Sequence, residues 1–143
     1  AMVTGYQRVN GTPYFFRNSG VWVENRGQAI AEYAETFVGK IPYVWGGVDL
    51  ESGVDCSGFT MAIHAEFDLS IPRVTYDQAT GGEYVSSDSQ QAGDLILYNS
   101  ESTNDHVGIY VGSGKVVHAP YPGKYVSYMD QYSITQNTIR RYW

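Results

Sequence analysis

The chain contains a single cysteine, Cys56, and its surroundings favour a chemical role. A glycine-rich stretch ends at Asp55 and a helical pattern begins at the cysteine, which places the thiol at a predicted helix N-terminus. A thiol with a pKa of about 8.5 is mostly protonated at neutral pH, and the positive end of a helix dipole is one of the few features that lower this pKa. Cys56 is therefore a candidate nucleophile, although an unpaired cysteine is more often a small buried apolar residue.

Two histidines downstream offer the groups that a thiol nucleophile needs. His106 and His118 each stand at the edge of a β-prone run, and a short Gly-Ser-Gly turn separates the two runs. Histidines on neighbouring antiparallel strands can face one helix end. One of them could act as the base for the thiol while the other orients that base, as in acyl-transfer sites.

Two amphipathic helices are predicted in the first half of the chain, at residues 25–38 and from Cys56 to about residue 67, because their apolar residues recur at helical spacing. Asp55 is well placed as the N-cap of the second helix. Gly58, in its first turn, allows a close approach of another backbone segment, and His64 is interpreted as structural. A short helical turn is expected at residues 73–78, before two consecutive glycines.

Strands are predicted to dominate the second half. The β-prone runs lie at 94–98, 107–111, 115–119 and 138–142, and the polar segment 99–105 is expected to be a loop that places His106 at the beginning of its strand. Helices followed by strands indicate an α+β domain with an antiparallel sheet, on which the N-terminal helices pack. Turn residues alternate with aromatic residues at 3–23, which predicts a β-hairpin.

Composition narrows the possible partners. The chain has 143 residues and a formal net charge of −6 without a block of like charges, so nucleic acid and anionic membrane surfaces are not expected partners. It has no apolar run long enough to insert into a bilayer. One cysteine excludes an internal disulfide and zinc sites built on paired cysteines. Neither a cofactor nor a metal is expected.

Six short motifs, taken together and in this order, resemble the NlpC/P60 cysteine peptidases. They are Tyr-x-Trp-Gly-Gly at 43–47, Asp-Cys-Ser-Gly-Phe at 55–59, Pro-Arg-x-Thr-x-x-Gln at 72–78, Gly-Asp-Leu at 93–95, His-Val-Gly-Ile-Tyr at 106–110 and His-Ala-Pro at 118–120. The resemblance covers about residues 25–143. It implies a papain-like α+β fold and hydrolysis of peptidoglycan stem peptides, usually at the bond between γ-linked D-glutamate and the following diamino acid.

The resemblance also implies roles for single residues. Cys56 would be the nucleophile, His106 the general base and acid, and His118 the polar residue that holds the imidazole. Substrate would be bound by Tyr43, Asp55, Ser57 and Thr75, with Tyr43 beside the thiol and Asp55 near the amino end of the stem peptide. Trp45 and the glycines after it are expected to define the fold rather than to bind ligand.

The predicted organisation is a hairpin or a remnant of a wall-binding repeat at 1–23 and a catalytic domain at 24–143. The domain is expected to be a monomer and part of a larger exported protein, secreted or associated with the cell wall. Three alternatives stay open: a wall amidase or peptidase of the CHAP type, a non-catalytic wall-binding module, and a zinc site formed by Asp55, Cys56, His106 and His118. The sequence leaves open whether the diamino acid is diaminopimelate or lysine.

Overall fold

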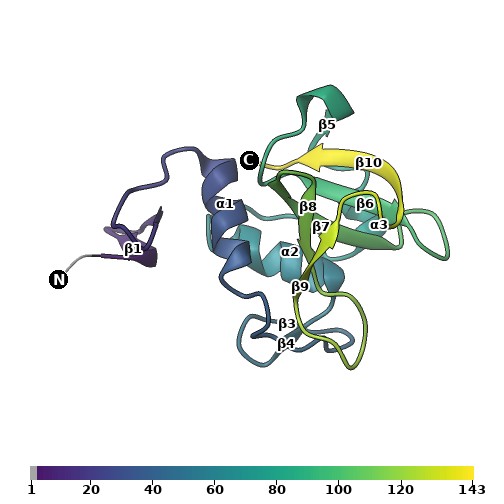
Figure 1. The fold of residues 1–143 in the computed structure, drawn as a ribbon, viewed down its shortest axis with the longest axis horizontal. Coiled ribbons are helices and arrows are strands. Elements are labelled where there is room, and N and C mark those ends of the chain that lie inside the picture. The colour runs from purple at the N-terminus through teal and green to yellow at the C-terminus, as the bar shows by residue number, and fades with distance from the viewer. Residues whose placement is uncertain (1–2) are drawn as a thin grey trace.

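The computed structural model of the protein describes residues 3–143, and Figure 1 shows its ribbon. The helices are α1 (Arg26–Glu35), α2 (Cys56–Ala65) and the single turn α3 (Thr75–Gln78), with a 3-10 turn, η1, at Ser87–Ser89. Most strands follow the helices: β5 (Glu83–Val85), β6 (Leu95–Asn99), β7 (His106–Gly112), β8 (Lys115–His118), β9 (Ser127–Asp130) and β10 (Thr135–Arg141). These strands form one antiparallel six-stranded sheet in the order β5-β10-β6-β7-β8-β9. The predicted α+β class is confirmed.

The two predicted helices are present, and both begin at a side-chain cap. The side chain of Asn25 accepts a hydrogen bond from the N–H of Gln28 at 2.8 Å and starts α1. Asp55 does the same for α2, accepting from the N–H of Gly58 at 2.7 Å. Each cap satisfies a donor that the first helical turn leaves without a partner. Both helices end a few residues before the predicted boundary, in turns that lead into the next segment.

The main apolar core lies between the two long helices and one face of the sheet (Figure 1). Successive side chains of a strand point to opposite faces, so Leu95 and Leu97 of β6 enter this core while Ile96 and Tyr98 enter a smaller cluster on the other face. The β6 strand is therefore buried on both sides, at the centre of the fold. It supports β7, which carries His106 at its first position.

The predicted hairpin is also present, as β1 (Gly5–Val9) paired with β2 (Thr12–Phe16). It lies on the side of α1 away from the sheet (Figure 1). Tyr6 stacks on Tyr33 of α1 at a centroid distance of 5.0 Å, and the buried Phe15 belongs to the main core. The hairpin thus packs against the rest of the domain. The first two residues of the predicted N-terminal unit lie outside the described residues.

The glycine-rich loop before α2 contains the small hairpin β3 (Val48–Asp49) and β4 (Gly53–Val54) and folds back onto the start of the helix. The carbonyl of Gly47 accepts a hydrogen bond from the N–H of Asp55 at 3.0 Å. A Cβ atom at Gly58 would collide with that same carbonyl, so only glycine permits this approach. The close approach predicted for Gly58 is confirmed. In the described part of the chain, no helix has the length and apolar character needed to cross a bilayer.

Candidate active site

A cleft of about 690 Å³ opens where the N-terminus of α2 meets the beginning of β7. Its lining residues are Tyr43, Trp45, Gly46, Asp55, Cys56, Ser57, Arg73, Val74, Thr75, Ser100, Glu101, Asp105, His106, Pro120 and Tyr121. They come from segments far apart in the sequence. The fold therefore brings the cysteine, one histidine and several charged side chains to one cavity.

Cys56 is partly buried at the first position of α2. Burial raises the pKa of its thiol to about 11, and the negative charge of Asp55 acts in the same direction. The backbone N–H groups of Val107 and Ser57 and of the cysteine itself lower this pKa, as expected for a helix start, but they do not outweigh the burial. The predicted lowering of the thiol pKa is therefore wrong for the protein without substrate, because desolvation of the thiolate exceeds the helix contribution.

The two histidines form a direct pair. Nε2 of His106 lies 2.8 Å from Nδ1 of His118, with the two rings nearly perpendicular at 83°. They stand on the neighbouring antiparallel strands β7 and β8, and a Cβ atom built at Gly108 would lie 3.2 Å from that of His118. The absence of a side chain at Gly108 lets the two imidazoles meet on one face. Since Nε2 of His106 is engaged by His118, Nδ1 is the ring nitrogen that remains for the cleft.

Both histidines are neutral at neutral pH. Burial lowers the pKa of His106 to about 4, although the nearby Asp105 carboxylate opposes this shift. Burial and the neighbouring His106 lower the pKa of His118 to about 3. A neutral imidazole can accept a proton at one nitrogen and donate at the other. The pair can thus combine a base that faces the cleft with a partner that fixes its orientation.

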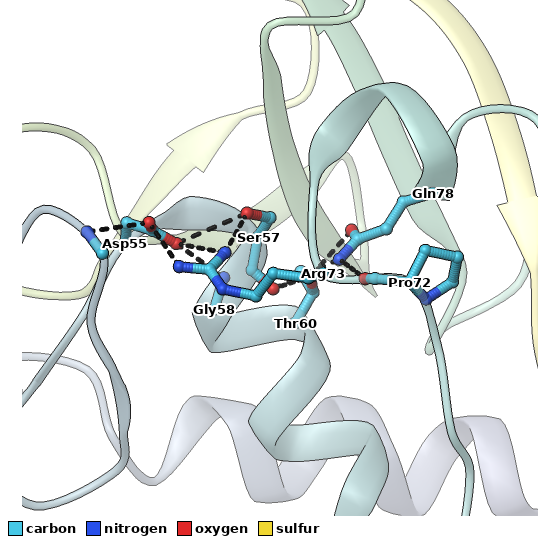
Figure 2. A network of polar contacts seen from close by, with 8 residues as sticks. Asp55, Ser57, Gly58, Thr60, Pro72, Arg73 and Gln78 are labelled. Carbon is cyan, nitrogen blue, oxygen red and sulfur yellow. Dashed lines mark hydrogen bonds and ion pairs between the residues drawn. The ribbon is translucent and has the colours of Figure 1, made fainter.

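A charged network surrounds the helix start (Figure 2). Arg73 binds both carboxylate oxygens of Asp55, at 3.1 and 2.8 Å, and donates to Oγ of Ser57 at 2.8 Å. Asp55 also accepts from the N–H groups of Gly46, at 3.1 Å, and Gly58, at 2.7 Å. The hydrogen bond from Arg73 to Asp55 raises the pKa of the guanidinium, which stays charged. One carboxylate therefore caps the helix, fixes the glycine-rich loop and holds an arginine in the cleft.

Behind this network, Gln78 fixes the segment that carries Arg73. Its side chain is fully buried, donates to the carbonyl of Pro72 at 2.8 Å and to that of Ser57 at 3.2 Å, and accepts from the hydroxyl of Thr60 at 2.9 Å. Figure 2 shows the side chain of Gln78 between Pro72 and the turn of α2 that carries Ser57 and Thr60. The loop position of Arg73 is thus coupled to the helix that carries Cys56.

The sequence matches a known family over most of its length. The family model of NlpC/P60 matches residues 39–142. The chain belongs to the NlpC/P60 family. The NlpC/P60 fold predicted from the motifs is confirmed as well by two solved structures. The NlpC/p60 domain of the peptidoglycan hydrolase SagA has a TM-score of 0.72 at 35% identity, covering 82% of this chain and 99% of that one. NlpC2 from Trichomonas vaginalis has a TM-score of 0.79 at 31% identity, covering 86% of this chain and 49% of that one.

Curated NlpC/P60 relatives are similar over shorter stretches. Gamma-D-glutamyl-L-lysine dipeptidyl-peptidase of Bacillus subtilis is 45% identical over 87 residues, which cover 59% of this chain and 29% of the relative. Murein DD-endopeptidase MepS/Murein LD-carboxypeptidase of Escherichia coli K12 is 44% identical over 80 residues, which cover 55% of this chain and 42% of the relative. The matched part of the chain thus corresponds to less than half the length of either relative.

Within this NlpC/P60 domain, most of the predicted site residues meet in the cleft. Tyr43 and Thr75 line it beside Cys56, and burial raises the pKa of the Tyr43 hydroxyl, to which the charge of a Cys56 thiolate would add. His118 lies behind His106 instead of lining the cleft. Across residues 3–143, no group of three or more His, Cys, Asp and Glu side chains is placed to hold a metal ion, so the four residues considered for a zinc site do not form one.

Two interpretations of single residues have different outcomes. His64 is fully buried, and its Nδ1 lies 2.8 Å from the carbonyl oxygen of Thr60, which confirms the structural interpretation. Trp45 leaves 85% of its surface exposed on the wall of the cleft, so the expectation that it defines the fold is wrong. Trp45 stands in a turn with Gly46, whose φ of +76° is a value that glycine readily adopts.

Several cleft residues were not singled out from the sequence, among them Arg73, Glu101 and Tyr121. Arg73 stands inside a quoted motif, but its role depends on Asp55, 18 positions away. Glu101 lies in the polar loop that precedes His106, and Tyr121 follows the His-Ala-Pro motif. The only sequence signal for the last two was their closeness in the chain to a histidine of the pair.

Proposed function

We propose that this NlpC/P60 domain is a cysteine endopeptidase that hydrolyses peptidoglycan stem peptides at the bond between γ-linked D-glutamate and the diamino acid. The single observation that carries the proposal is the shared cleft, in which a thiol at a helix N-terminus and a histidine held by a second histidine line one cavity. The names of relatives that act on peptidoglycan support this substrate class. In this proposal the parent protein is secreted or associated with the cell wall.

In the proposed reaction, Sγ of Cys56 attacks the carbonyl carbon of the scissile peptide bond while Nδ1 of His106 takes the thiol proton. The resulting imidazolium gives this proton to the leaving amine as the C–N bond breaks, which leaves a thioester. Water then attacks the thioester with His106 again as base, releasing the carboxylic acid and restoring the thiol. The backbone N–H of Cys56, at the start of α2, can donate to the developing oxyanion.

Burial shapes this mechanism. Because it raises the thiol pKa to about 11 and lowers that of His106 to about 4, the resting pair is a neutral thiol and a neutral imidazole. We therefore expect the proton to move as the carbon–sulfur bond forms. His118 stabilises the orientation of the imidazole rather than its charge, since a neutral partner contributes less to an imidazolium than a carboxylate does.

The substrate side of the proposal assigns different tasks to the charged residues. Asp55 is only 8% exposed, and its two oxygens already accept from Arg73 and from two backbone N–H groups. We propose that it holds Arg73 and Ser57 at the wall of the cleft, so that these two side chains and the hydroxyl of Thr75 contact the stem peptide. A carboxylate with this many partners is a weak acceptor for a further ammonium group.

Digestion of purified peptidoglycan and of defined muropeptides, followed by mass spectrometry, tests this proposal. The wild-type protein is expected to release fragments cut after γ-D-glutamate, with activity lost on alkylation and retained in EDTA. Cys56→Ala is expected to release none, and Cys56→Ser keeps the size and polarity of the side chain as a control for folding. Equal fragments from wild type and Cys56→Ala, or no fragments from either, would overturn the proposal.

The N-terminal hairpin is proposed to cover one edge of the domain rather than to bind the wall. Tyr6 and Phe15 pack into the domain, and the hydroxyl of Tyr6 donates to the carbonyl of Glu66 at 2.6 Å. Pull-down on purified cell walls with and without residues 1–23 tests this proposal, since unchanged binding after truncation is the expected result. Loss of wall binding by a truncated protein that is still folded would contradict it.

A further inference from the structure

The loop before His106 has a fixed shape. The carboxylate of Asp105 accepts hydrogen bonds from the N–H groups of Ser100, Glu101 and Ser102 at 2.7, 2.8 and 3.0 Å. These N–H groups lower the pKa of Asp105 against the opposing effect of burial, so the carboxylate is ionised and occupied inside the loop. The loop end is fixed as well, because the side chain of Asn99 accepts from the N–H of Asn104 at 2.9 Å.

Glu101 is the acidic residue of the cleft whose charge has no such partner. Its side chain is exposed, it lines the cleft, and it forms no ion pair with any of residues 3–143. The one cationic side chain that lines the cleft, Arg73, is engaged by Asp55. With three carboxylates against one guanidinium, the cleft carries an excess of negative charge, and Glu101 is the part of it that a ligand can reach.

The position of Glu101 indicates which half of a substrate it meets. In the proposed reaction His106 protonates the leaving amine, so the residue that contributes this amine lies on the imidazole side of the scissile bond. The loop that carries Glu101 runs directly into His106 and is held rigidly by Asp105. The side chain of the leaving residue, which is the diamino acid, is therefore the part of the substrate nearest to Glu101.

We propose that Glu101 is a specificity-determining residue that selects the diamino acid by charge, an inference that rests on the proposed function. A carboxylate here favours a side chain that ends in an ammonium group alone, as in lysine. It disfavours one that carries a carboxylate beside its amine, as in diaminopimelate, because like charges at short range repel. The site is exposed, so the preference is modest and weakens with salt.

Two defined tripeptides test this proposal, L-Ala-γ-D-Glu-L-Lys and L-Ala-γ-D-Glu-meso-diaminopimelate, with kcat/KM measured for each. The wild-type protein is expected to prefer the lysine peptide, and Glu101→Gln to reduce the ratio of the two kcat/KM values about threefold, the size typical of one exposed ion pair. Glu101→Lys is expected to reduce the ratio further. Glu24→Gln makes the same charge change at an exposed position outside the cleft and should leave the ratio unchanged.

The outcomes separate this inference from the proposed function. If both peptides are cleaved and Glu101→Gln has the wild-type ratio, selection by Glu101 is overturned while the peptidase stands. The same conclusion holds if the wild-type ratio does not decrease when the salt concentration is raised from 0.05 to 0.5 M, which shortens the screening length from about 14 to 4 Å. If the wild-type protein cleaves neither peptide nor longer muropeptides, the proposed function fails, and the selectivity proposed for Glu101 fails with it.

Discussion

Replacing Arg73 tests whether the network at the start of α2 supports the fold as well as the cleft. Arg73→Met removes two hydrogen bonds to the Asp55 carboxylate and one to Ser57, while keeping most of the side-chain volume. The Asp55 side chain is 12% exposed and that of Arg73 is 36% exposed, so the pair lies between a surface ion pair, worth at most about 1 kcal/mol, and a buried one, whose disruption costs about 3–5 kcal/mol. We expect Arg73→Met to lower the free energy of unfolding by about 2 kcal/mol, less than for a fully buried pair, because Asp55 keeps its two backbone donors.

The assay is equilibrium unfolding in urea, together with thermal melting, for which this loss corresponds to a decrease in Tm of about 6 °C. Arg73→Lys keeps the positive charge but not the bidentate geometry, and it should lower the free energy of unfolding by about half as much. Arg17→Met is the matched control, since Arg17 also binds a carboxylate, that of Glu32, through two nitrogens but is 50% exposed, and its effect should be smaller. Equal losses for Arg73→Met and Arg17→Met, or a stable Arg73→Met, would refute the argument from burial.

Three further predictions concern the remaining features of the site. His64, His106 and His118 have pKa values lowered by burial from 6.5 to about 4, 4 and 3, so between these values and 6.5 the unfolded chain binds protons that the folded protein does not. The stabilisation that these neutral histidines contribute is therefore fully present above pH 6.5, and the free energy of unfolding should fall as the pH drops towards 4. A free energy of unfolding that stays constant between pH 7 and 5 in urea titrations would contradict these shifts. Gly58→Ala should destabilise the protein by about 1–3 kcal/mol despite the better helix propensity of alanine, because its Cβ meets the carbonyl of Gly47; a stabilised variant in thermal melts would count against the close approach. His118→Ala should lower kcat about tenfold with little change in KM, and His118→Asn should recover part of the loss by supplying an acceptor to His106; equal kcat values for wild type and His118→Ala would remove the positioning role.

The elements that position the site were predictable because their signals are local. The cap at Asp55, the apolar spacing of α2 and the alternation along β7 are all read within a few residues, and the antiparallel pairing that joins His106 to His118 follows from the short turn between their strands. The edge strands β5 and β9 were not predicted. They face solvent along much of their length, so β5 buries only Val85, and no apolar pattern marks them in the sequence.

Other features of the site depend on contacts between distant segments, and for these the sequence carries no comparable signal. The pairing of Arg73 with Asp55 requires the fold to bring a loop back over a helix end. The exposure of Trp45 depends on how its turn is placed on the rest of the fold. The direction of the thiol pKa shift also depends on contacts between distant segments. A helix start lowers a thiol pKa wherever it occurs, but the degree of burial is set by everything packed around it.

The charged network at the start of α2 and the Cys56 thiol influence each other electrostatically. Asp55 must precede Cys56 to cap the helix, and as a consequence its negative charge raises the pKa of the adjacent thiol. Arg73 binds that carboxylate through both oxygens, and Asp55 holds the arginine at the wall of the cleft that Cys56 also lines. We propose that this arginine compensates part of the Asp55 charge, so that a firm helix start is compatible with a thiol that passes its proton to His106 in the proposed reaction.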